Sequence, residues 1–165
     1  MRLQFGPHKG RTTETLLLRV PDYAWWVLEH SPTSRLAGDF SRLKAAFDAR
    51  PFAAHCQSCG QDATHASAYA GSVDLHASCD ECRLYEPAQA PLGFSGDLRT
   101  FQAAVRHAEA TSPRRRRRNV RAIVRNLARA KGLPKRVTES AAERFFEPAA
   151  RTSGLSPPRA PSGPT

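Results

Sequence analysis

The chain has 165 residues, of which 40% are hydrophobic, and this is enough for one domain or for two small ones. No apolar run approaches the ~20 residues that a membrane-spanning helix needs, so we expect no membrane segment. The formal net charge of +10 and the pI near 10.3 indicate a polyanionic partner.

The basic charge is unevenly distributed along the chain. Residues 51–90 hold one Lys or Arg and five Asp or Glu, whereas residues 91–147 hold fourteen and five. The segment that contains all four cysteines is therefore acidic, and metal-bound thiolates would add to its negative charge. We expect a polyanion to bind outside this segment.

The first 50 residues predict a short hairpin followed by three helices. Residues 3–5 are a candidate strand, and a turn over residues 6–10 leads into a return strand. Thr13 is expected to cap a first helix, and Pro21-Asp22 to end it and to start a second helix over residues 23–30. A third helix is indicated by apolar residues spaced four, three and four apart, namely Leu36, Phe40, Leu43 and Phe47.

We expect the large side chains of these elements to form a core. Its predicted members are Phe5, Leu16, Tyr23, Trp25, Trp26, Leu36, Phe40 and Leu43. For the two tryptophans the alternative is an exposed binding surface. Lys9 and Arg11 lie at the tip of the turn, which stays exposed, so both are candidates for contact with phosphate.

Two strings in this segment carry a family resemblance. Phe5-Gly6-Pro7-His8-Lys9-Gly10-Arg11-Thr12, followed by Pro21-Asp22-Tyr23-Ala24-Trp25, resembles the small module at the C-terminus of exodeoxyribonuclease X-like proteins. That module runs Phe-Gly-x-x-x-Gly-Lys-Thr and then Asp-x-x-Tyr-x-x-Trp or a close variant, so Arg11 takes its basic position. The resemblance covers about residues 3–30 and implies a compact accessory module seen beside nucleases and in phage or bacterial proteins. The nuclease domain itself is not expected, because the Asp-x-Glu motif of a two-metal exonuclease is missing.

All four cysteines fall into one pattern, Cys56-x2-Cys59 and Cys79-x2-Cys82. A spacer of two residues lets both sulfurs of a pair turn towards a common point, and two pairs complete the tetrahedral shell of a zinc ion. Gly60 follows the first pair, where a positive φ is useful, whereas Arg83 follows the second. Two disulfides, free thiols and an iron–sulfur cluster are the alternatives. Disulfides are disfavoured because residues 1–8 contain no apolar stretch for a secretory signal.

Four thiolates leave no open coordination position, so this zinc is expected to stabilise a fold and not to catalyse. His55, His65 and His76 could in principle replace a thiolate, but we expect them to be surface residues or supports for the ligands. Between the two cysteine pairs, residues 63–69 and 73–76 predict a β-hairpin with Gly71 in its turn. The acidic charge of this segment favours a purely structural role or a protein docking site over direct contact with nucleic acid.

A basic helical region follows a linker over residues 87–93. Ser95 is expected to cap a helix whose inward side chains are Leu98, Phe101, Val105 and Ala108. The run Arg114-Arg115-Arg116-Arg117-Arg118 then leads into a second helix, which ends near Gly132 and Pro134. Beside an apolar stripe of Val120, Ile123, Val124 and Leu127, one face of this helix is predicted to carry Arg114, Arg118, Arg121, Arg125 and Arg129.

Charges of one sign on a helix face repel each other by about 0.2–0.5 kcal/mol for each neighbouring pair, and cations at a helix N-terminus also oppose the dipole. A bound polyanion would remove both costs, and planar guanidinium groups suit phosphate. We therefore predict that the run contacts nucleic acid. A solvated face and contact with an acidic protein are the alternatives.

A last helix is expected to begin at Thr138, and residues 148–165 to form a disordered, proline-rich tail. The chain thus divides into an N-terminal module (1–50), a zinc ribbon (51–86), a basic helical region (95–147) and the tail. The predicted fold class is α+β.

We expect a cytoplasmic, non-enzymatic protein with one structural Zn²⁺, which binds the backbone of DNA or RNA with little sequence preference. The alternative is a protein–protein adaptor that docks on a nuclease or on another DNA-processing or phage component. An enzyme is disfavoured because no Ser/His/Asp, Cys/His or paired-carboxylate arrangement is apparent.

Overall fold

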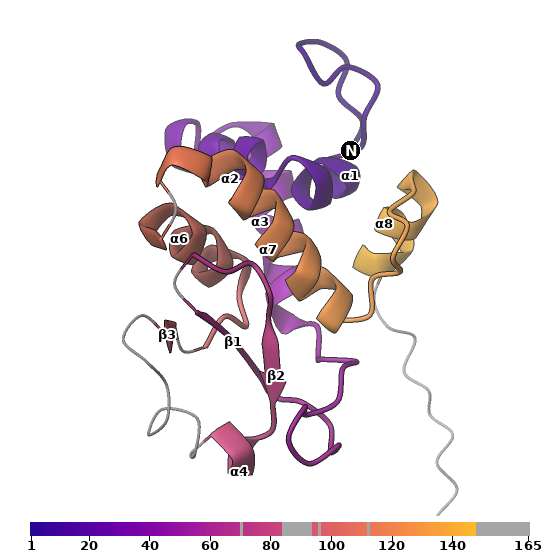
Figure 1. The fold of residues 1–165 in the computed structure, drawn as a ribbon. Coiled ribbons are helices and arrows are strands. Elements are labelled where there is room, and N and C mark those ends of the chain that lie inside the picture. The colour runs from indigo at the N-terminus through magenta and orange to yellow at the C-terminus, as the bar shows by residue number, and fades with distance from the viewer. Residues whose placement is uncertain (70, 84–93, 96, 112, 148–165) are drawn as a thin grey trace, which may run out of the picture.

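The computed structural model describes residues 1–69, 71–83, 94–95, 97–111 and 113–147. The predicted linker (87–93) and tail (148–165) lie outside these ranges. The described chain is a mixed α+β fold in which the helices form one body and a small antiparallel sheet lies at one end of it (Figure 1). The predicted fold class is therefore confirmed. Within the same ranges, no helix is both long enough and apolar enough to span a membrane.

Three helices follow a short antiparallel bridge between Arg2 and Thr12. α1 spans Thr13–Arg19, α2 spans Pro21–His30 and α3 spans Arg35–Ala49. Thr12, and not Thr13 as predicted, caps α1, because the Thr12 hydroxyl accepts from the N–H of Thr15. Pro21 occupies the first turn of α2, where its missing N–H costs no hydrogen bond.

The sheet has the strand order β2-β1-β3. β1 (His65–Tyr69) lies antiparallel to β2 (His76–Ser78) and to β3 (Phe94–Ser95), and the short helix α4 (Asp80–Arg83) follows β2. The predicted hairpin is confirmed, but its second strand lies at residues 76–78 and not at 73–76, because His76 to Ser78 pair with Ser67 to His65.

The helix that we predicted to begin at Ser95 begins later. Ser95 pairs with Ala68 of β1, so this residue extends the sheet instead of capping a helix. α6 spans Phe101–Thr111, and the hydroxyl of Thr100 accepts from the N–H of Ala103 at its start.

The arginine run is only partly helical. A 3-10 turn, η1 (Pro113–Arg115), precedes α7 (Arg116–Ala130), so the helix starts two residues later than the run itself. Gly132, with a φ of +95°, ends α7 as predicted, and the N–H of Leu133 donates to the carbonyl of Ala128. α8 (Glu139–Phe146) begins at Thr138, whose hydroxyl accepts from the N–H of Ala141.

One buried apolar cluster joins the helices and β1. α7 lies at its centre and packs against α1, α2 and α6, while α8 packs against α1 and α3 (Figure 1). The side chains of Ala66 and Ala68 connect β1 to this cluster. The core is therefore continuous across the predicted boundaries at residues 50 and 95. The buried side of α7 consists of Val120, Ile123, Val124, Leu127 and Ala128.

Two aromatic residues that we predicted to be buried are exposed. Phe5 is 83% exposed in the N-terminal turn, and Trp26 is 52% exposed on α2, whereas Trp25 is 7% exposed. The helical period explains the difference between the tryptophans, because Trp25 shares its side of α2 with Pro21, whereas Trp26 lies above polar Asp22.

The start of the cysteine segment is fixed to the C-terminal end of α7. The N–H groups of Ala53 and Ala54 donate to the carbonyl of Ala130 at 2.7 and 3.0 Å. Lys131 is buried, and its Nζ donates to the carbonyl of Arg50 at 2.6 Å, while Nε of Arg50 donates to the carbonyl of Lys131 at 3.0 Å. Burial lowers the pKa of Lys131. The first cysteine pair is thus attached to the same helix that carries the arginines.

The two tryptophans should respond differently to truncation. We expect Trp25→Ala to lower the free energy of unfolding by about 3–5 kcal/mol, because it leaves a cavity in the core. Trp26→Ala should change it by less than about 0.5 kcal/mol, as is usual for a surface position. Urea unfolding of both variants, followed by circular dichroism, measures the two effects. Equal losses of stability would contradict the assignment of Trp26 to the surface.

Candidate metal centre and nucleic-acid interface

The four cysteines come together at the end of the molecule that holds the sheet. Their Sγ atoms all lie within 4.8 Å of one another, and those of Cys59 and Cys79 are 3.6 Å apart. The first pair comes from the loop after α3, and the second from the junction of β2 and α4. Four thiol groups so close together could hold a metal ion. We call Cys56, Cys59, Cys79 and Cys82 the cysteine cluster.

The two cysteine pairs reach this arrangement by different local structures. In the first pair the chain turns at Gly60, whose φ is +77° and whose N–H donates to the carbonyl of Cys56 at 2.9 Å. The second pair lies on the helical turn of α4, where the N–H of Arg83 donates to the carbonyl of Cys79 at 3.0 Å. A helical turn needs no positive φ, so an arginine is suited to the position that follows the second pair.

Hydrogen bonds to sulfur favour a thiolate in the cluster. Burial alone would raise the pKa of Cys56, but backbone N–H groups of Cys79, Cys59 and Ser58 donate to its sulfur and lower the pKa to about 6. The neighbouring sulfurs of Cys59 and Cys79, followed by burial, raise the pKa of Cys82. Further thiolates therefore repel the first one, and a divalent cation would offset that repulsion.

The nearby histidines do not belong to the cluster. His65 is buried, and its Nε2 lies 2.6 Å from Oδ1 of Asp80, while Nη1 of Arg83 lies 3.1 Å from its Nδ1. The hydrogen bonds from His65 and Thr64 lower the pKa of Asp80. Because Asp80 and Arg83 are the two ends of α4, His65 supports the helical turn that carries the second cysteine pair. His55 is exposed and lies 3.3 Å from Asp62.

The five arginines of the run, Arg114 to Arg118, are all exposed at the N-terminal end of α7. Among the described residues, Arg114, Arg115 and Arg118 have no hydrogen-bond or ion-pair partner. Arg116 pairs with Glu109 of α6 at 2.5 Å, and Arg117 lies 3.9 Å from Asp22 of α2. Within the described chain, three positive charges of the run are therefore uncompensated.

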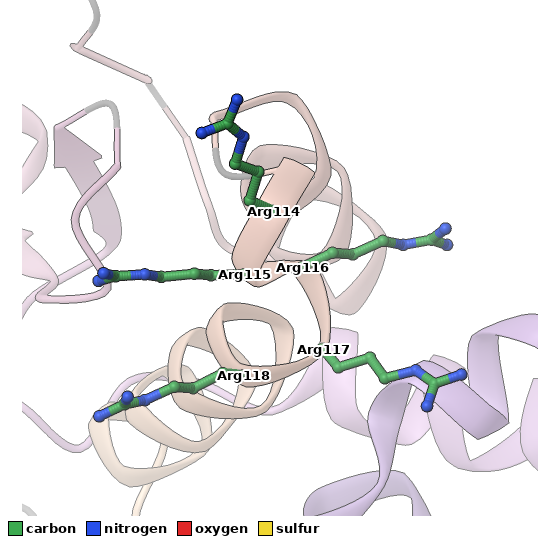
Figure 2. Close-up of a pocket in the computed structure, with 5 residues that line it drawn as sticks. All are labelled: Arg114, Arg115, Arg116, Arg117 and Arg118. Carbon is green, nitrogen blue, oxygen red and sulfur yellow. The ribbon is translucent and has the colours of Figure 1, made fainter.

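The five guanidinium groups point in different directions. Arg115 and Arg118 extend to one side of the helix, and Arg116 and Arg117 to the other, while Arg114 projects from the turn before it (Figure 2). Together they line a shallow hollow of about 570 Å³. The first turn of α7 contains no acidic residue, and its cap residue makes no side-chain hydrogen bond to the helix. The dipole of α7 and the arginines therefore present positive charge at the same place.

The other predicted arginines of α7 differ in their exposure and in their interaction partners. Arg121 is exposed but pairs with Asp22 at 3.3 Å. Arg125 is half-buried, and among the described residues its Nε has no partner. Arg129 is exposed and donates to the carbonyl of Lys135 at 3.2 Å. With Arg118, these three share one face of α7, as the spacing predicted, whereas Arg114 lies in η1 and is not part of that helix.

The structure does not bring Lys9 and Arg11 into the hollow. Both are exposed in the N-terminal turn, but the residue of that turn that borders the arginines is His8. His8 lines a second hollow together with Tyr23 and Trp26. We predicted Trp26 to be buried, with an exposed binding surface as the alternative, and we assigned no binding role to His8 or Tyr23. Trp26 lies on the same side of α2 as the polar residues Asp22, Glu29 and His30, and this pattern in the sequence indicates that its ring is exposed.

Comparison of the chain with protein-family models, with curated proteins and with solved structures finds no significant match.

The cysteine cluster predicts one metal ion per chain in the purified protein. Cys59→Ser and Cys82→Ser should each lose the metal and make the loops that carry the cysteine pairs more sensitive to protease, because the metal would no longer hold the two pairs together. Elemental analysis and limited proteolysis measure both effects. Ser58→Ala is the matched control, since Ser58 is exposed between the first two cysteines and is not a ligand. Retention of the metal by either cysteine variant would contradict the assignment.

Proposed function

We propose that this protein is a non-enzymatic accessory protein that binds nucleic acid through the N-terminal end of α7, with little sequence preference. One observation supports this proposal most strongly. Arg114, Arg115 and Arg118 are exposed beside a helix N-terminus and, within the described chain, have no acidic partner. If this face were only a solvated surface, acidic residues between the arginines would increase stability, because they would reduce the repulsion between the positive charges.

The arrangement favours contact with the nucleic-acid backbone over reading of bases. The guanidinium groups extend to both sides of the helix and do not form one row (Figure 2). Phosphates lie along both strands of a duplex and along every single strand, so diverging arginines can each reach one. Binding would then release condensed counterions and would depend steeply on salt.

We further propose that the cysteine cluster holds a structural Zn²⁺. All four donors are sulfur, which zinc accepts in closed tetrahedral sites, and such a site leaves no position for a reacting water. Zinc would fix the two cysteine pairs and, through the hydrogen bonds at Ala130, support the C-terminal end of α7. Zinc-bound thiolates are typical of reducing compartments, which favours the cytoplasm.

A protein–protein adaptor is the second candidate, and the exposed Phe5 favours it. Phe5 borders an apolar hollow of about 540 Å³, together with Leu3, Trp26 and Leu36. In this proposal the hollow docks a nuclease or another DNA-processing or phage component, in line with the resemblance of residues 3–30 to exodeoxyribonuclease X-like proteins. The arginines of α7 would then contact an acidic surface of that partner.

Two triple variants with equal net charge test the proposal. Replacing Arg114, Arg115 and Arg118 by alanine should weaken binding to duplexes of different sequence about equally. It should also flatten the log–log dependence of affinity on salt by about 2–3, at ~0.9 for each phosphate that is no longer neutralised. Fluorescence anisotropy at several salt concentrations measures both.

The control replaces Lys135, Arg136 and Arg144, which are exposed beyond the end of α7 and on α8, by alanine. It removes the same charge and should keep most of the affinity and the slope. Equal losses in the two triple variants would mean that net charge alone drives binding. An unchanged slope in the first variant would remove α7 from the mechanism and favour the adaptor.

A further inference from the structure

An aromatic groove lies beside the arginines of α7. It has a volume of about 460 Å³ and is formed by the N-terminal turn, by α2 and by the first turns of α7. We call it the Trp26 groove. Its lining residues are His8, Val20, Asp22, Tyr23, Trp26, Arg116, Arg117 and Arg121.

The rings of the aromatic wall lie close to one another. The ring of Trp26 lies nearly parallel to those of Tyr23 and His30, with interplanar angles of 18° and 13° and centroid distances of 6.5 and 5.2 Å. Tyr23 is held in turn by His8, whose ring meets it edge-on at 4.6 Å, and by Phe40 of the core. Little conformational entropy would therefore be lost when a flat ligand stacks on this wall.

Trp26 lies outside the buried core of the protein. The ring is 52% exposed, whereas the buried side of α2 is supplied by Ala24, Trp25 and Val27. Tyr23 and His30 lie beside the Trp26 ring in offset, nearly parallel arrangements. The part of the indole that they leave uncovered can contact another flat ring.

The opposite wall is basic. Arg116, Arg117 and Arg121 enter the groove from α7, and Asp22 is the one acidic residue among the described residues that line it. Asp22 lies 3.3 Å from Arg121 and 3.9 Å from Arg117, so it neutralises part of their charge and also orients both side chains. Figure 2 shows that Arg116 and Arg117 extend to the same side of the helix, away from Arg115 and Arg118. Arg116 also pairs with Glu109 at 2.5 Å, so three arginines face two carboxylates and the groove keeps a small excess of positive charge next to the aromatic wall.

We propose that the Trp26 groove holds an unpaired base of single-stranded nucleic acid, stacked on Trp26, with the adjoining phosphates on Arg116 and Arg117. The combination of a cationic groove and stacking rings is the one that single strands use. A base inside a duplex has both of its faces covered by its neighbours and cannot stack on the ring. The proposal rests on the proposed function, and it adds a preference for single strands over duplexes.

The test compares one single strand and one duplex. The probes are a labelled oligothymidylate of about 16 nucleotides, the upper end of known site sizes, and a mixed-sequence duplex of the same length. Trp26→Ala should weaken binding of the single strand about 5- to 150-fold, the range for the loss of one stacked base. Binding of the duplex should change less than twofold. Fluorescence anisotropy measures both affinities.

Two further variants serve as controls. Trp26→Phe keeps a flat ring and should retain most of the affinity for the single strand. Phe5→Ala removes a more exposed ring that does not line the groove, and it should affect neither probe. Unfolding curves confirm that each variant is folded.

Failure of the groove proposal and failure of nucleic-acid binding through α7 give different results. If Trp26→Ala leaves binding of the single strand unchanged, or weakens both probes equally, the groove proposal is wrong. Nucleic-acid binding through α7 would still stand, provided that the duplex is bound and that alanine at Arg114, Arg115 and Arg118 weakens it. If the wild-type chain binds neither probe at low salt, both proposals fail. If polyglutamate displaces the single strand as well as unlabelled oligothymidylate does, the groove recognises acidic protein and not bases.

Discussion

The burial of one side of α7 determines where its charged side chains lie. Its apolar side, from Val120 to Ala128, is buried against three other helices, and this burial fixes the direction of the opposite side. Burial contributes about 25 cal/mol for each Å² of apolar surface removed from water. The free energy gained by burying several aliphatic side chains is therefore larger than the repulsion between neighbouring arginines, which is about 0.2–0.5 kcal/mol for each pair. The fold can therefore hold a strongly cationic helix end in place without a ligand. The arginines are exposed because the opposite side of α7 is buried in the core.

The two ends of α7 contact different parts of the molecule. The N-terminal end carries the arginine run and borders the Trp26 groove. The C-terminal end accepts hydrogen bonds from Ala53 and Ala54 and lies next to the buried Lys131, which joins it to the segment that leads into the cysteine cluster. A metal in the cluster would thus stabilise the base of the helix and would not itself meet the ligand. The acidic charge of the cysteine segment agrees with this separation, because it would repel a polyanion.

The sequence predicted those features that depend on local periodicity and spacing. The stripe of α7, its end at Gly132, the cap at Thr138 and the approach of the four cysteines all follow from such patterns. It did not predict features that depend on distant partners. Ser95 reads as a helix cap by itself, and only its pairing with Ala68 makes it part of a strand. The Trp26 groove joins residues almost a hundred positions apart, so no local pattern contains it, although the polar neighbours of Trp26 on α2 indicated that its ring is exposed.

Hydrogen exchange with and without bound nucleic acid shows which part of the protein forms the binding surface. The first backbone N–H groups of α7 have no partner within the helix and should exchange quickly in the free protein. We expect oligothymidylate to slow exchange at residues 114–121 and in α2, and to leave exchange in the cysteine segment, residues 51–83, unchanged. Slowing confined to residues 51–83, with none at the start of α7, would exclude binding through α7 and would make the cysteine segment the interface.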